Sequence, residues 1–210
     1  MYDQIYWTLT FGDTVHYDPV SLRPEMKKYT VFIDGISKAF AATGVRVGWS
    51  MGPAELIAKM KAINSHLGAW APMAEQKAVA NYLMRHDEVK AYLAGFKTEL
   101  SYLLNSIYVG FQQLKKEGFP VDAIPPQAAI YLTVQIDLAG KTVNGKVLRS
   151  QHDVTDYILN EAKLALVPFN CFGAASESSR YRLSVGCCKK EDISEMLGKL
   201  KDALKKTADH

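Results

Sequence analysis

The chain has 210 residues, of which 48% are hydrophobic and 22% charged, so its composition is that of a globular protein that can bury a sizeable core. A net charge of +3 is too small to indicate a nucleic-acid-binding surface, and no apolar run approaches the ~20 residues of a membrane span. Three cysteines and five scattered histidines form neither a disulfide framework nor a metal-ligand pattern, and no leader opens the chain, so we expect a cytoplasmic protein without metal, membrane span or nucleic-acid partner.

Strand-like segments occupy the beginning of the chain. Residues 1–12 begin as a strand that is expected to carry both Asp3 and Tyr6, and a polar loop follows. The β-branched and apolar run 29–34 predicts a buried strand, and residues 45–51 predict the strand that returns after it. Lys38 follows the end of the buried strand, which is where ligands bind in open α/β sheets.

Helical periodicity dominates the middle of the chain. Pro53 and Pro72 each open a predicted helix, the first with apolar residues at helical spacing. Residues 87–116 carry a long apolar stripe that predicts one amphipathic helix, which Gly118 ends. Because such a stripe is usually part of a core, we assign it no chemistry.

The last part of the chain alternates between strands and helices. Strands are predicted over 128–136, 164–167 and 180–186. A helix is predicted over 154–163, and another over 190–206 ends the chain. This segment therefore predicts a second α/β layer.

Residues 34–49 carry most of the functional information, because they place Lys38 and Arg46 between two predicted strands. A lysine amine can condense with an aldehyde cofactor, and an arginine fork suits a phosphate dianion. The serine, lysine and Gly-x-Arg-x-Gly of this segment stand in one register that resembles the lysine signature of the class I/II aminotransferases, fold type I enzymes that use pyridoxal 5'-phosphate. Outside this register Lys38 would read as a surface lysine.

The resemblance implies roles for five residues. Lys38 is the implied catalytic lysine and binds the cofactor, Arg46 holds the cofactor phosphate, and Ser37 is a weaker candidate for the same oxygens. Asp3 and Tyr6 match the family's Asp-x-x-Tyr, whose side chains partner the pyridine nitrogen and the phenolic oxygen. A carboxylate at the ring nitrogen keeps it protonated, and the protonated ring accepts electrons from the substrate.

An arginine near the end of the chain completes the resemblance. Arg182 stands in an Arg-Leu-Ser sequence like that of the family's substrate-binding arginine, which would clamp the α-carboxylate of an amino or 2-oxo acid. Arg180 shares its predicted face but not its place in the motif, so we interpret it as a structural residue or a residue at the rim of the site. Residues 166–173 resemble the loop before this arginine. The chain departs from the family at Phe169, where glycine is frequent, and at Gln4, where glutamate is common.

The resemblance covers nearly the whole chain but only the C-terminal half of a family member. It implies an α/β fold in which residues 1–95 are the C-terminal part of the cofactor-binding large domain, a mostly parallel sheet with helices. Residues 96–210 would be the small C-terminal α/β domain. The segments that complete the cofactor site are missing before Asp3, so we expect a fragment that is inactive alone and a homodimer as full-length protein.

The implied reaction moves an amino group between an amino acid and a 2-oxo acid. Three other interpretations remain open: a lyase or cyclopropane-forming synthase that uses the same residues, a non-catalytic effector-sensing domain, and a domain with no activity of its own. The substrate amino acid cannot be read from these residues. Trp70 and Tyr131 could border the site, but both are at least as often packing residues.

Overall fold

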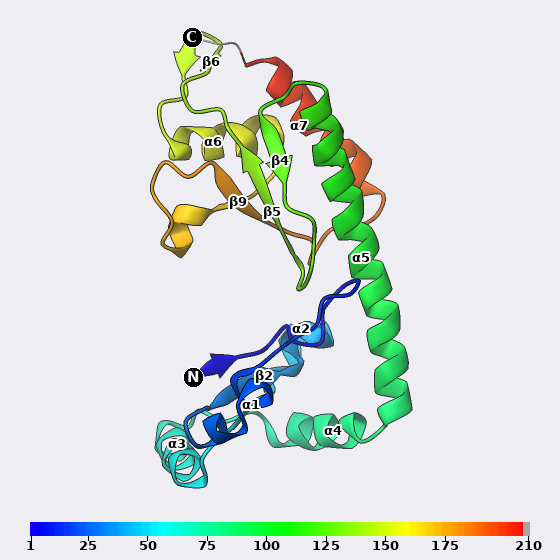
Figure 1. Cartoon of the computed structure of the whole chain (residues 1–210), viewed down its shortest axis with the longest axis vertical. Coiled ribbons are helices and arrows are strands. Elements are labelled where there is room, and N and C mark those ends of the chain that lie inside the picture. Colours follow the sequence, from blue (N-terminus) through cyan, green and yellow to red (C-terminus); the bar gives the residue numbers. More distant parts are fainter. Residues whose placement is uncertain (208–210) are drawn as a thin grey trace. The chain divides into compact units, whose positions relative to one another are not determined.

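The computed structural model describes residues 1–207 and divides into two compact units, Met1–Lys97 and the part from Thr98 onward (Figure 1). Helix α5 (His86–Lys116) contains both this division and the predicted domain boundary after residue 95. None of the helices formed by residues 1–207 is long and apolar enough to cross a membrane.

The first unit contains a three-stranded sheet in the order β1-β2-β3. Strand β1 (Tyr2–Asp3) runs parallel to β2 (Phe32–Gly35), and β3 (Gly48–Met51) runs antiparallel to β2. Parallel pairing brings the carboxyl ends of β1 and β2 to the same edge of the sheet. The residues that follow β1 and the residues that follow β2 therefore start from the same edge of the sheet.

The segment between β1 and β2 is more structured than the polar loop expected from the sequence. It contains the helices α1 (Pro19–Leu22) and η1 (Pro24–Lys28), each with proline at its first position. The carboxylate of Asp18 caps α1 by accepting hydrogen bonds from the amides of Val20 and Ser21. Capping and proline chemistry form these short helices, which have no apolar periodicity for a sequence pattern to detect.

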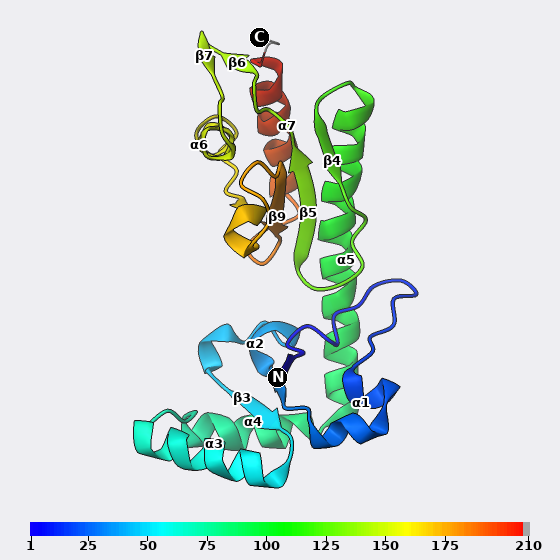
Figure 2. The same cartoon turned by 60° about the vertical axis from the view of Figure 1, so that its left-hand side comes forward.

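Two helices follow the sheet, α3 (Ala54–Leu67) and α4 (Met73–Leu83), as the prolines before them predict (Figure 2). None of their residues is buried. Helix α5 confirms the long helix predicted over 87–116, but its apolar stripe is buried only in the second unit, through Leu100, Leu103, Leu104, Ile107, Phe111 and Leu114.

The second unit contains a four-stranded antiparallel sheet in the order β4-β5-β9-β8. Its strands are β4 (Val121–Ala123), β5 (Tyr131–Ile136), β8 (Val167–Pro168) and β9 (Arg180–Ser184). Strands β5 and β9 confirm the strands predicted over 128–136 and 180–186 with shorter bounds, and β8 overlaps the strand predicted over 164–167 only at Val167. The sequence reading missed β4 and the hairpin of β6 (Thr142–Val143) and β7 (Lys146–Val147), because two or three residues carry no measurable alternation.

Helices α6 (Gln151–Glu161) and α7 (Asp192–Lys205) confirm the two helices predicted here. Helix α7 runs beside the C-terminal part of α5 (Figures 1 and 2), and the hydroxyl of Tyr157 on α6 donates to the carbonyl of Ala203 on α7 at 2.7 Å. Alternate residues of β5 and β9 are buried with these helices, among them Leu132, Val134, Tyr181 and Leu183. The other face of the sheet is left to Tyr131, Thr133 and Arg182.

Candidate active site

A pair of facing glycines closes the connection between β2 and β3. Gly35 and Gly48 are register partners, and a Cβ on Gly35 would lie 2.9 Å from the carbonyl oxygen of Val47. A Cβ on Gly48 would lie 3.0 Å from the carbonyl oxygen of Asp34. Both positions therefore need glycine so that the strands can approach. The amide of Ile36 donates to the carbonyl of Val47 at 3.3 Å, so a hydrogen bond also joins the two ends of the connection.

Ser37, Lys38 and Arg46 lie on this closed connection, residues 36–47. Lys38 is half-buried in the helix α2 (Ile36–Ala39), and Arg46 is exposed after the helix η2 (Thr43–Val45). The hydroxyl of Thr43 donates to the carbonyl of Ser37 at 3.0 Å, and the guanidinium of Arg46 donates to the carbonyl of Thr43 at 2.8 Å. Thr43 thus links the lysine turn to the arginine.

The backbone of Arg46 has a left-handed conformation, with a φ of 60°. For a residue with a Cβ this conformation costs about 1–2 kcal/mol. Such conformations gather at functional sites, where the surroundings impose them. The glycine closure and the Thr43 contacts supply that constraint here.

Asp3 and Tyr6 lie differently from the expectation that one strand carries both. Asp3 is exposed at the end of β1, beside Ile33 of β2, and so reaches the sheet edge that residues 36–47 follow. Its carboxylate accepts a hydrogen bond from the amide of Ile5 at 3.1 Å, and this local bond turns the chain out of the strand. Tyr6 is therefore half-buried in a turn, and its placement on a strand was wrong.

Asp34 is a buried carboxylate that the sequence analysis did not single out. Its side chain accepts hydrogen bonds from the indole of Trp7 at 2.9 Å and from the amide of Gly35 at 2.7 Å, and a further one from the side chain of Gln4. Burial raises the pKa of Asp34 above its ordinary value, the charge of Asp3 adds to this, and the three hydrogen bonds oppose it. Asp34 thereby ties the segment after Asp3 to the strand that leads to Lys38.

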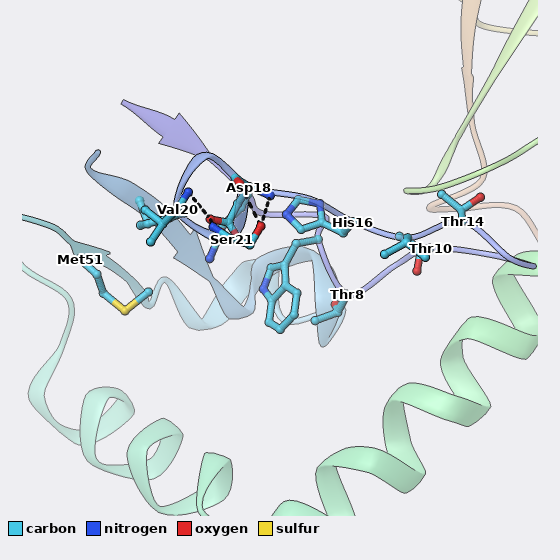
Figure 3. A pocket seen from close by; sticks show the side chains of 12 residues that line it. Thr8, Thr10, Thr14, His16, Asp18, Val20, Ser21 and Met51 are labelled. Atoms are coloured by element: carbon cyan, nitrogen blue, oxygen red, sulfur yellow. Dashed lines mark hydrogen bonds between the residues drawn. The ribbon is translucent and has the colours of Figure 1, made fainter. Parts of the chain in front are cut away.

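A cavity of about 930 Å³ opens on the first unit (Figure 3). Its lining includes Gln4, Trp7, His16 and Met51, and none of the predicted site residues lines it. The carboxylate of Asp18 on its wall is already engaged by the cap of α1. We place the candidate site at Asp3 and residues 36–47, because both follow the carboxyl ends of the adjacent parallel strands β1 and β2.

Arg182 lies in the second unit, on β9 opposite Thr133 of β5. Its side chain is half-buried, and its guanidinium carbon lies 4.5 Å from the centre of the Tyr131 ring and 4.6 Å from that of Phe172. Its Nε is buried without a hydrogen-bond partner, and within residues 1–207 no carboxylate pairs with it. A half-buried cation without a counter-charge is suited to binding an anion.

Three residues that contact or support the predicted site residues were not predicted from the sequence, although the sequence contains a clue to each. Thr43 stands inside the lysine motif, and Phe172 inside the loop before Arg182. Asp34 ends an apolar strand, where a carboxylate is unusual.

The residues described, 1–207, hold no group of three or more histidine, cysteine or acidic side chains placed to bind a metal ion. Trp70, the other residue considered for the border of the site, is exposed.

Comparison with known proteins extends the resemblance beyond these motifs. A family model described as "Aminotransferase class I and II" matches residues 1–200. The chain is 34% identical over 173 residues to an aspartate aminotransferase of Geobacillus stearothermophilus and 30% identical over 176 residues to a probable aspartate/prephenate aminotransferase of Rickettsia felis. Each match covers 82% of this chain and 41% of the relative.

Solved structures show the same fold. The aspartate aminotransferase of Rhizobium meliloti matches with a TM-score of 0.79 at 24% identity, covering 98% of this chain and 49% of that one. An aromatic aminotransferase of Pyrococcus horikoshii OT3 matches with a TM-score of 0.81 at 23% identity, covering 97% and 50%. The chain thus spans about two fifths of these curated relatives and about half of the solved structures. Since the family model matches nearly its whole length, the chain belongs to the class I and II aminotransferase family.

Proposed function

We propose that the chain is the part of a pyridoxal 5'-phosphate-dependent aminotransferase that carries the catalytic lysine. The whole protein would move an amino group between an amino acid and a 2-oxo acid. The observation that carries the proposal is the closed connection of residues 36–47, which holds Lys38 and Arg46 on one hydrogen-bonded loop in a member of this family.

The side chains present fit this cofactor chemically. Lys38 and Asp3 follow the carboxyl ends of two adjacent parallel strands, where α/β sheets bind ligands. Arg46 has five donors and the structure bonds one of its nitrogens to Thr43, so others are available for a phosphate. When bound, the cofactor supplies an electron sink that stabilises negative charge at the substrate's Cα.

The matched residues would then have separate roles in binding and in proton transfer. Lys38 would bind the cofactor's aldehyde and would take the proton from the substrate's Cα as general base. Asp3 would hold the proton on the ring nitrogen, and Tyr6 would donate a hydrogen bond to the phenolic oxygen. Arg46 would bind the phosphate with help from Ser37.

Arg182 would bind the α-carboxylate of the amino or 2-oxo acid. Its buried, unpartnered Nε and its lack of a counter-charge within residues 1–207 support this role, because an anion would compensate the guanidinium. A homodimer and a cytoplasmic location belong to the same proposal. The three free cysteines, Cys171, Cys187 and Cys188, support a reducing compartment.

The first experiment tests the lysine directly. The purified chain is mixed with pyridoxal 5'-phosphate and reduced with borohydride, and the labelled lysine is mapped by mass spectrometry. We expect labelling concentrated at Lys38, because this half-buried residue lies on the closed connection that also carries the expected phosphate-binding arginine. Lys38→Arg should lose that label, whereas Lys59→Arg should keep it, since Lys59 is an exposed lysine of α3 paired with Glu55.

Labelling spread evenly over the lysines would contradict the assignment. In the full-length protein, Lys38→Ala should lower the rate of 2-oxo acid formation by at least about 100-fold, because a general base contributes that much or more. Undiminished turnover would remove Lys38 from the mechanism.

A further inference from the structure

The guanidinium of Arg182 lies against two aromatic rings that come from different parts of the second unit. Tyr131 is on β5, two residues from the register partner of Arg182, so the two side chains share a sheet face as a diagonal pair. Phe172 ends the short helix η3 (Phe169–Phe172), which leads from β8 back toward β9. Both ring centres lie within the ~6 Å range of a cation–π contact.

A third ring supports this arrangement. The rings of Phe169 and Phe172 meet edge to face, with centroids 6.1 Å apart and planes at 88°. Phe172 is 53% exposed, so burial alone does not fix its position. Its contacts with Phe169 on one hand and with the guanidinium on the other are the ones that can hold it.

We propose that Phe169, Phe172 and Tyr131 are positioning residues for Arg182, which fix its guanidinium so that the terminal nitrogens stay available to a carboxylate. The inference rests on the carboxylate-binding role of Arg182 in the proposed function. An arginine is a long and flexible side chain, and a binding site that must order it loses affinity. Aromatic rings that hold the arginine side chain in place before binding avoid that loss of affinity.

The absence of other restraints makes the rings decisive. Nε is buried without a partner, and no salt bridge of Arg182 is formed within the described part of the chain. The hydrogen bonds and ion pairs that usually fix a buried arginine are therefore replaced here by ring faces. If the rings were only apolar filling, an aliphatic side chain of similar size would serve as well as an aromatic one.

That difference defines the test. Phe172→Leu keeps an apolar side chain but removes the ring, whereas Phe172→Tyr keeps the ring, and Phe172 is exposed enough for both variants to fold. The Nε–Hε signal of Arg182, identified by its loss in Arg182→Lys, is followed by ¹⁵N NMR. We expect an ordered signal in the native chain and in Phe172→Tyr, and a mobile, faster-exchanging one in Phe172→Leu. Phe169→Ala should loosen it in the same direction.

The second readout is the affinity for 2-oxoglutarate, used as the 2-oxo acid probe and measured by titration. The affinity should fall by about 2- to 10-fold in Phe172→Leu, the range expected when one flexible side chain must be ordered on binding.

An Arg182 signal that stays ordered in Phe172→Leu would overturn the proposal, as would a loosened signal with unchanged affinity. Failure of the proposed function would look different. In that case Arg182→Lys would bind 2-oxoglutarate as well as the native chain does, whatever the rings do to the order of the guanidinium.

Discussion

Asp34 shows how one buried side chain can join two parts of a site. It sits on the strand that leads to Lys38, and it accepts hydrogen bonds from Trp7 and Gly35 as well as from the side chain next to Asp3. A carboxylate in this position loses solvation, and three donors offset only part of that loss, which is why its pKa is raised. The carboxylate therefore organises the segment at some cost to stability.

The raised pKa of Asp34 predicts a pH dependence with a definite sign. A carboxyl whose folded-state pKa exceeds its unfolded-state value contributes stability below the ordinary value of 3.8, and that contribution is lost as the pH rises through the folded-state pKa. Asp34→Asn, which stays neutral, should therefore gain stability relative to the native chain as the pH rises through this window. Urea unfolding followed by tryptophan fluorescence measures it, because Trp7, Trp49 and Trp70 all lie in the first unit.

Asp18 provides a control of opposite sign in the same unit. Hydrogen bonds from the amides of Ser21 and Val20 lower the pKa of Asp18, so its contribution is present above 3.8 and is lost on acidification. Asp18→Asn should thus lose stability relative to the native chain as the pH rises. A pH-independent difference for Asp34→Asn would show that its carboxylate is not perturbed.

At the scale of elements, α5 contains two glycines in very different surroundings. A Cβ on Gly95 would meet no atom within 4 Å, whereas a Cβ on Gly110 would overlap the end of the Leu197 side chain on α7. Glycine inside a helix normally lowers stability. At Gly110 its use is explained by the close approach of α7, and at Gly95 no contact explains it.

The two glycines therefore predict opposite effects of one substitution. Gly95→Ala should stabilise the helix by about 0.5–1 kcal/mol, as the gain in helix propensity is unopposed. Gly110→Ala should lower the thermal midpoint, because overpacking costs about 1–3 kcal/mol and exceeds that gain. Circular dichroism melts measure both. Adding Leu197→Ala to Gly110→Ala should recover part of the loss, and a double mutant without recovery would show that Leu197 is not the obstacle.

An element or motif of this protein can be predicted from the sequence when contiguous residues carry its whole pattern. The 31 residues of α5 repeat one pattern many times, so the helix is predicted almost to the residue. The lysine motif is likewise contiguous, so Ser37, Lys38 and Arg46 are predicted as site residues without any structure. Strands such as β4 are too short for a pattern. Tyr6 was misplaced because a single bond from Ile5 to the Asp3 carboxylate ends the strand early.

Tertiary contacts account for what remained out of reach. The rings around Arg182 come from β5 and from η3, and only the folded sheet brings them together. Asp34 meets Trp7 because β1 pairs with β2, a contact that no spacing in the sequence reveals. The motif therefore predicts which residues carry the chemistry, and the fold shows which side chains lie around them.

For the whole molecule, the two units differ in how they bury apolar side chains. The second unit buries sheet and helix residues together, among them Leu104, Ile107, Val134 and Leu204. In the first unit α3 and α4 bury no residue, and Leu67, at the end of α3, is 72% exposed. Helices of this length are marginal without tertiary packing. The stability of the chain is therefore uneven along its length.

This unevenness predicts the pattern of hydrogen exchange. Backbone amides of α3 and α4 should exchange fast in the isolated chain, because local opening there breaks few buried contacts. The amides of α7 and of α5 beyond Leu100 should exchange slowest. Exchange followed by mass spectrometry resolves these peptides, and equal protection of α3 and α7 would contradict the uneven stability inferred here.

The glycine closure at Gly35 and Gly48 also bears on the order of assembly. These two residues are joined by a short connection, whereas Tyr2 must find Phe32 across the much longer segment that contains α1 and η1. Closing a shorter loop costs less chain entropy and happens sooner. We expect the hairpin with Lys38 and Arg46 to form early and Asp3 to dock on it late, an order that pulsed exchange during refolding reads from the amides of Ile36 and Gln4. The folding chain would then hold Lys38 and Arg46 on one closed connection before the carboxylate of Asp3 arrives.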